Sequence, residues 1–176
     1  MITNKQKEII TENCIKYFNE AGIVLSGNEK RNIEITDFGL GRINEFGLQL
    51  LTYINTERVC AKEMILFTGQ ICPEHKHPDF EKKLGKEETF RCRWGSAYLY
   101  VPGEATINPK ANIPQDRRKY YTVWHEVILN PGEQHTIYAN TLHWFQAGPQ
   151  GAIISEFSTQ STDEKDIFTD PMVQRI

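Results

Sequence analysis

The chain has 176 residues, a formal net charge of −3 and a hydrophobic fraction of 39%. Such a length is typical of one domain with a substantial core, and the charge balance excludes the strongly basic surface of most nucleic-acid-binding proteins. No apolar run reaches the roughly 20 residues that a transmembrane helix needs, and the polar N-terminus lacks the apolar core of a signal peptide. We therefore expect a cytoplasmic protein with free cysteines and without nucleic-acid or membrane partners.

The N-terminal segment is predicted to be helical. Apolar residues recur at helical spacing over residues 4–20, with Asn4 as the expected N-cap and Gly22 suited to the left-handed position after the helix. A second, short helix is predicted to begin near Ser26.

From about residue 33 the pattern changes to short runs of β-branched and aromatic residues, separated by turn signals. The predicted strands are 33–38, 48–55, 61–67, 88–94, 97–101, 120–129, 135–137, 143–147 and 152–158. This pattern predicts an all-β sandwich or barrel. We expect residues 1–32 to pack on a barrel formed by 33–176, as a single domain. The tail over 161–171 is not predicted to be sheet, but its apolar pair at 167–168 indicates that it packs back onto the barrel.

Three histidines and a glutamate predict a metal site. His75 and His77 are two residues apart, and on a β-strand this separation places both side chains on one face. Glu88 and His143 follow on later predicted strands. Three imidazoles and one carboxylate suit a divalent ion of Mn, Fe, Co, Ni or Zn and leave coordination positions open. The predicted ion is therefore accessible to a substrate.

The spacing of these residues resembles the first cupin motif. The match consists of Gly69, five residues and His75-x-His77, followed by Glu88, six residues and Gly95. The ten residues between His77 and Glu88 exceed the usual gap. The resemblance implies a cupin double-stranded β-helix, which is a jelly-roll barrel, with the metal inside its mouth.

A later stretch resembles the second cupin motif. It consists of Gly132, five residues, Tyr138-x-Asn140, two residues and His143. The ligand position is kept there, while the turn positions differ from the usual residues. The other histidines fit neither motif and are expected to be structural: His125 and His135.

Three segments narrow the resemblance to the D-lyxose isomerase branch of the cupins. They are residues 86–93, 140–148 and 156–171, and the last contains the distinctive sequence Ile-Phe-Thr-Asp-Pro. The resemblance implies a metal-dependent isomerase that interconverts D-lyxose and D-xylulose, and often D-mannose and D-fructose. It also implies a homodimer and a divalent ion, for which Mn²⁺ is preferred because the reaction needs no redox change.

Two residues are predicted to be catalytic. Glu156 follows an apolar strand and shares a face with Ile154, which makes it a candidate general base inside the barrel; the family also has its catalytic glutamate there. The alternative is a carboxylate at the barrel rim. Lys86 stands two residues before Glu88 and shares its face, so it can donate to a substrate oxygen or carry the second proton. The alternative for Lys86 is a solvated charge run. Asp166 and Phe168 are candidates for sugar binding.

Other functions are compatible with the same ligands. A cupin dioxygenase would use iron and oxygen, but would leave Glu156 without an evident role. A sugar-phosphate isomerase would need several cations around the phosphate; Arg91 and Arg93 could supply them, although an exterior salt-bridge role is preferred. A non-catalytic sugar-binding cupin is the third alternative. Trp144 and Phe90 are expected to take part in barrel packing rather than in substrate contacts.

Overall fold

A computed structural model describes residues 2–175. Over this range, two α-helices precede nine strands that belong to one sheet. The helices are α1 (Asn4–Glu20) and α2 (Gly27–Arg31), and two 3₁₀ turns are η1 (Arg118–Tyr120) and η2 (Asp163–Lys165). The strands are β1 (Glu34–Thr36), β2 (Leu48–Asn55), β3 (Cys60–Leu66), β4 (Ile71–Lys76), β5 (Glu88–Val101), β6 (His125–Leu129), β7 (Gln134–Ile137), β8 (His143–Ser158) and β9 (Ile167–Phe168).

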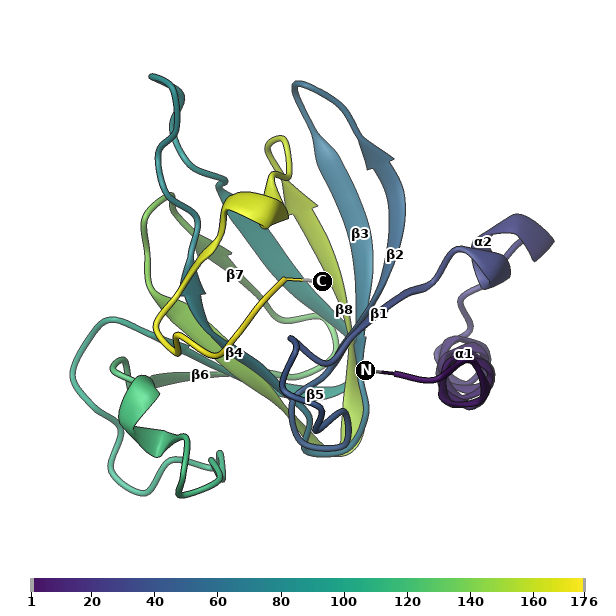
Figure 1. The fold of residues 1–176 in the computed structure, drawn as a ribbon, viewed down its shortest axis with the longest axis horizontal. Helices are drawn as coiled ribbons and strands as arrows, with labels where there is room; N and C mark the ends of the chain where they lie inside the picture. Colours follow the sequence, from purple (N-terminus) through teal and green to yellow (C-terminus); the bar gives the residue numbers. More distant parts are fainter. Residues whose placement is uncertain (1, 176) are drawn as a thin grey trace.

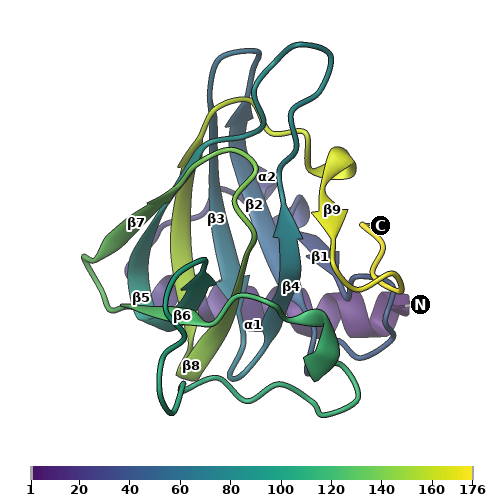
Figure 2. The same ribbon diagram turned by 90° about the vertical axis from the view of Figure 1, so that its left-hand side faces the viewer.

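The sheet curls into a barrel around the two long strands β5 and β8, which pair with each other along most of their length (Figures 1 and 2). The strand order is β1-β2-β3-β8-β4-β9, and β5 adds β6 and β7 on its other side. Because alternate residues of each strand point inward, side chains from several strands meet inside the barrel. Phe90 and Phe145 are large buried side chains that point into its interior, whereas Trp144 stacks on Tyr100 on the opposite face of the sheet.

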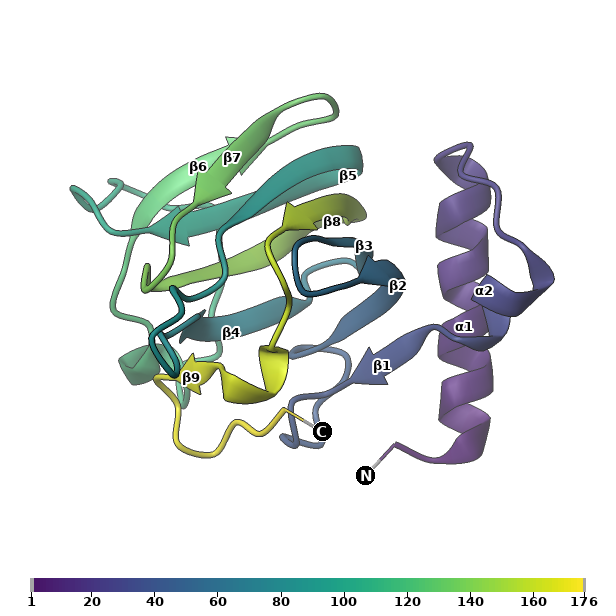
Figure 3. The ribbon, with the colours of Figure 1, turned by 90° about the horizontal axis from the view of Figure 1, so that it is seen from above.

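Helix α1 packs on the outside of the barrel (Figure 3). Its buried face consists of Ile10, Cys14 and Phe18, spaced four residues apart, and this face covers outward-facing residues of β2, β3 and β8. The N-cap is Thr3 rather than the predicted Asn4, because the Thr3 side chain accepts a hydrogen bond from Gln6 in a capping box. No helix within residues 2–175 is long and apolar enough to cross a membrane.

Two pairs of predicted strands are in fact single strands. The predicted segments 88–94 and 97–101 form β5, and 143–147 and 152–158 form β8. The interruptions that the sequence pattern shows are bulges at Gly95 and Gly151, both of which have positive φ. A Cβ on Gly95 would lie 2.1 Å from the carbonyl oxygen of Gly151, so a glycine is required where the two strands bend together.

Three further predictions are corrected. The strand predicted over 120–129 begins only at His125, after the turn η1. A strand that was not predicted separately, β4, carries His75. The tail contributes the short strand β9, whose Ile167 and Phe168 pair with Lys76 and His75 of β4. The expectation of a tail without sheet is therefore wrong for this pair, while its packing onto the barrel is confirmed.

Candidate active site

The three predicted histidine ligands meet in the barrel. His75 lies on β4 opposite His143 of β8 in the register, and His77 follows directly after β4. One nitrogen from each ring lies within 4.8 Å of the other two, and all three side chains are buried. This cluster could hold a metal ion.

Each ring is oriented through its Nδ1 atom. His75 Nδ1 lies 2.8 Å from the carbonyl oxygen of Pro73, and His143 Nδ1 lies 2.9 Å from that of Thr141. A carbonyl oxygen only accepts hydrogen bonds, so Nδ1 carries the hydrogen and Nε2 presents a lone pair. Such an anchored tautomer is the usual arrangement of a metal-binding histidine.

Glu88 completes the predicted ligand set. Its Oε1 atom lies 3.1 Å from His77 Nε2 and 3.0 Å from His143 Nε2. The His143 Nε2 atom is buried and makes no hydrogen bond to the described residues. A carboxylate oxygen facing imidazole lone pairs needs a proton or a cation between them. The four residues therefore fit a divalent ion.

The pKa shifts in this cluster agree with that charge requirement. Burial and the two neighbouring imidazoles lower the pKa of His75 well below its usual value, so this ring is neutral, as a ligand must be. Burial also lowers the pKa of His77, but Glu88 and the hydrogen bond with Asp166 outweigh it and raise the pKa to about 9. The Glu88 carboxylate thus favours positive charge at His77, and a divalent ion would take the place of the proton when His77 acts as a neutral ligand.

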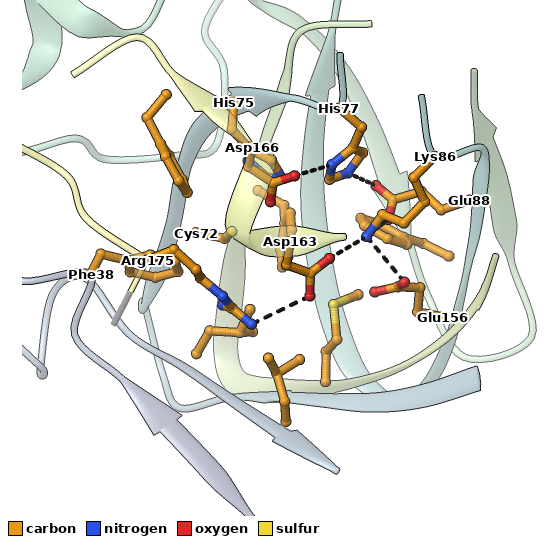
Figure 4. A pocket seen from close by; sticks show the side chains of 16 residues that line it. Phe38, Cys72, His75, His77, Lys86, Glu88, Glu156, Asp163, Asp166 and Arg175 are labelled. Carbon is orange, nitrogen blue, oxygen red and sulfur yellow. Dashed lines mark hydrogen bonds and ion pairs between the residues drawn. The ribbon is translucent and has the colours of Figure 1, made fainter. Parts of the chain in front are cut away.

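Lys86 and Glu156 lie together beside the histidine cluster (Figure 4). Lys86 Nζ contacts Glu88 Oε2 at 2.8 Å and Glu156 Oε1 at 3.2 Å. Glu156 Oε1 also accepts a hydrogen bond from Ser158 at 3.0 Å. Burial by itself would lower the pKa of Lys86, but the surrounding carboxylates, Glu156 first, raise it overall. Both side chains are buried. Glu156 is therefore not a carboxylate at the barrel rim, and Lys86 is not part of a solvated charge run.

Asp166 and Phe168 also line this pocket. Asp166 Oδ1 lies 2.6 Å from His77 Nδ1 and so orients that ring, as the backbone carbonyls orient the other two. The Phe168 ring stands beside His75, with 5.3 Å between ring centroids. A largely apolar wall completes the pocket, and it consists of Phe38, Leu48, Leu50, Met64, Cys72, Phe90 and Phe145.

Three charged residues of the site were not predicted. Asp163 contacts Lys86 through Oδ1 at 3.2 Å and Lys62 through Oδ2 at 2.5 Å, and Arg175 approaches the same Oδ2 at 3.4 Å. Burial would raise the pKa of Asp163, but the three cations lower it well below its usual range. A signal for Lys62 was present, because it alternates with the inward-facing Met64 on a predicted strand. Asp163 and Arg175 lie outside any periodic pattern.

The segment between His77 and Glu88 determines how Lys86 reaches the site. Phe80 and Lys83 form a bridge, and the two residues between them have positive φ, so the chain turns back tightly. A Cβ on Gly85 would lie 2.1 Å from the carbonyl oxygen of His77, and a glycine is therefore required at this crossing. The insertion is a compact hairpin that returns the chain to the barrel mouth.

Residues predicted to lie outside the site do so. His125 is exposed and contacts a backbone carbonyl, and His135 is not part of the histidine cluster. Arg93 is 45% exposed at its side chain and lies 3.8 Å from Glu63, in agreement with the exterior role. Arg91 donates to Gln134 on the outside of the barrel. Trp144 is fully buried in the aromatic core, as expected.

Comparisons with known proteins identify the family. The family model described as D-lyxose isomerase matches residues 28–176. The chain belongs to the D-lyxose isomerase family. It is 58% identical over 176 residues to the D-lyxose ketol-isomerase of Thermofilum sp. (strain ex4484_79), with 100% of this chain and 98% of the relative covered. It is 57% identical to the D-lyxose/D-mannose isomerase of Thermosediminibacter oceani, covering 100% and 97%. The prediction of a sugar isomerase is confirmed.

Solved structures confirm the predicted fold. The L-ribose isomerase of Cellulomonas parahominis aligns with a TM-score of 0.80 and 15% identity, covering 98% of this chain and 95% of that one. The L-ribose isomerase of Acinetobacter sp. DL28, solved with L-ribose, aligns with a TM-score of 0.80 and 14% identity, covering 98% and 94%. The all-β cupin barrel of the sequence analysis is thus the fold of this protein.

Proposed function

We propose that this enzyme interconverts D-lyxose and D-xylulose, and D-mannose and D-fructose, by proton transfer through an enediolate, with a divalent ion as cofactor. One observation carries the proposal: the buried Glu156 carboxylate, the Lys86 ammonium group and the histidine cluster share one pocket. The substrates follow the names of the relatives from Thermofilum and Thermosediminibacter oceani.

Glu156 is the proposed general base. Moving the carbonyl from C1 to C2 requires a base that takes the proton from C2 and returns it to C1. Lys86 and Ser158 both donate to Oε1 of Glu156, at 3.2 and 3.0 Å. We therefore assign Oε2 as the oxygen that takes the substrate proton. The neighbouring donors hold the carboxylate in one orientation, which favours proton transfer along a defined direction.

Lys86 is the proposed donor to the substrate. It stands between the proposed base and Glu88, and its ammonium group can donate a hydrogen bond to the oxygen on which negative charge develops. Phe168 and Asp166 are proposed to contact the sugar, through the ring face and through a carboxylate oxygen that accepts from hydroxyls. The pocket's cations are paired with carboxylates, so the described residues favour an uncharged sugar over a sugar phosphate.

The metal is proposed to be held by His75, His77, Glu88 and His143. A bound divalent ion would polarise the substrate carbonyl and stabilise the negative charge of the enediolate. Mn²⁺ is our first choice because no redox change is needed, and Zn²⁺, Co²⁺, Fe²⁺ and Ni²⁺ suit the same donors.

The substitution Glu156→Gln tests the assignment of the base. It keeps the shape of the side chain and removes its basicity, so kcat for ketose formation from D-lyxose should fall about 100- to 10,000-fold. Metal content and thermal stability should be retained. The matched control is Glu87→Gln. Glu87 is exposed directly before a barrel strand, so its side chain should be dispensable for the reaction. Unchanged turnover by the Glu156 variant would contradict the mechanism.

Isotope exchange tests the reaction type. A base that carries the proton exchanges it with solvent, so turnover of D-lyxose in D₂O should place deuterium at C1 of the ketose. Mass spectrometry of the product measures this directly. A product without deuterium, together with unchanged turnover by the Glu156→Gln variant, would indicate a hydride shift and would leave Glu156 without the proposed role. Failure to form ketose from either D-lyxose or D-mannose, with any of the five metals, would contradict the function itself.

A further inference from the structure

Lys62 is a buried lysine that the proposed mechanism does not use. Its side chain is 5% exposed, and lysine is almost never this buried unless its charge is paired. It lies on β3, directly opposite Glu156 of β8 in the strand register. The ammonium group therefore faces the barrel interior from the strand next to the proposed base.

The Lys62 ammonium group binds the C-terminal segment. Nζ lies 2.5 Å from Asp163 Oδ2 and 2.7 Å from Ser161 Oγ. Asp163 uses its other oxygen, Oδ1, to accept a hydrogen bond from Lys86 Nζ at 3.2 Å. Hydrogen bonds between two charged groups are stronger than neutral ones. The Asp163 carboxylate thus links Lys62 to Lys86.

Lys86 depends on this link for its position. The Lys86 ammonium group contacts three carboxylates: it forms an ion pair with Glu88 Oε2 and donates hydrogen bonds to Glu156 Oε1 and Asp163 Oδ1. Of these three carboxylates, only Asp163 is neither a proposed metal ligand nor the proposed base. Because the lysine stem is long and flexible, the loss of one acceptor frees the ammonium group to move.

We propose that Lys62 is a positioning residue for the isomerase reaction: through Asp163 it holds the Lys86 ammonium group against Glu156. The inference rests on the proposed function, since it matters only if Lys86 and Glu156 act on the substrate. Removing Lys62 leaves Asp163 Oδ2 with only its longer contact to Arg175, at 3.4 Å, and the carboxylate then draws Lys86 away from the base. A displacement of about 1 Å at reacting groups can lower the rate about 100-fold.

The substitution Lys62→Met is the first test, because methionine keeps much of the length and removes the charge. We expect kcat for D-lyxose to fall about 100-fold, while KM changes less than about threefold, since the sugar-facing surface is unchanged. If the wild-type enzyme forms ketose and the Lys62→Met variant has the same kcat, the inference is overturned and the proposed function stands. A wild-type enzyme that forms no ketose would overturn both.

The double variant Lys62→Met/Asp163→Asn separates positioning from stability. Lys62→Met alone leaves a buried carboxylate short of a partner and is expected to be unstable, whereas the double variant removes both charges. A residue with only a structural role would regain activity as the melting temperature recovers. A positioning role predicts that kcat stays about 100-fold low in the stable double variant, because an amide oxygen holds the Lys86 ammonium group more weakly than the Asp163 carboxylate does. This variant decides the question even if Lys62→Met does not fold.

The control is Arg117→Met. Arg117 Nη1 lies 2.9 Å from Asp170 Oδ2, so this ion pair also fastens the C-terminal segment to the barrel, but it does not include Lys86 or Glu156. We expect a lower melting temperature with kcat within about threefold of wild type. Equal losses of kcat in the Arg117 and Lys62 variants would overturn the inference, since they would show that fastening the segment is all that matters.

Discussion

The two sides of the pocket are held in place in different ways. On the histidine side, His75 and His143 are each oriented by a backbone carbonyl two residues earlier in the chain. On the lysine side, Lys86 is oriented by Glu156 and Asp163, which lie 70 and 77 residues away. A carbonyl is present whatever the side chain, so local anchors survive most substitutions. The contact between Lys86 and Asp163 exists only when the C-terminal segment is folded onto the barrel.

His77 is intermediate between the two sides. It belongs to the histidine cluster, yet its Nδ1 atom is oriented by Asp166, a side chain from the C-terminal segment. The predicted ion therefore depends on this segment through one of its ligands. The comparison predicts that substitutions in the tail affect His77 and Lys86 more than His75 and His143.

The largest effect is expected from removing a ligand. His143→Ala should abolish stoichiometric binding of Mn²⁺ and lower activity about 1000-fold or more, because a ligand and a buried anchor of Glu88 are both lost. Metal content measured by mass spectrometry and ketose formation check this. The control is His135→Ala, which removes a histidine outside the cluster and should leave both quantities unchanged.

A smaller effect is expected from the side-chain anchor of His77. Asp166→Asn keeps the size of the side chain but weakens the orientation of the ring, and such substitutions lower metal affinity about 10- to 100-fold. A competition titration with a metal chelator measures the change. If Asp166 also contacts the sugar, KM for D-lyxose should rise in fully metal-loaded enzyme. Wild-type affinity for the ion would show that the tail does not contribute to the histidine side.

The smallest effect is expected at Gly85, in the segment that joins His77 to Lys86. Gly85→Ala places a methyl group against the carbonyl oxygen of His77, and crowding of this kind costs about 1–3 kcal/mol of folding free energy. Urea unfolding monitored by fluorescence measures the cost. Gly27→Ala is the matched control, because the added methyl group would lie 3.6 Å from the end of the Arg31 side chain, an ordinary contact. Equal stability of the two variants would contradict the tight crossing between His77 and Lys86.

The histidine side could be predicted from the sequence because its geometry is local. The alternation of a β-strand places His75 and His77 on one face, and the two cupin motifs supply Glu88 and His143. Glu156 was accessible to the same reasoning, since alternation along its strand places it on the same face as Ile154. Its proximity to Lys86 was not, because that distance depends on how the hairpin over residues 78–87 returns to the barrel.

Long-range contacts decided the rest. The sequence by itself determined the cupin barrel, its outer helix and the residues of the histidine cluster, because strand periodicity and motif spacing act over a few residues. Only the tertiary structure brought Lys62, Asp163 and Arg175 to the site, and only it turned part of the tail into a strand beside His75. The physical reason is that a buried charge needs a partner wherever the fold can supply one, and spacing along the chain does not specify that partner.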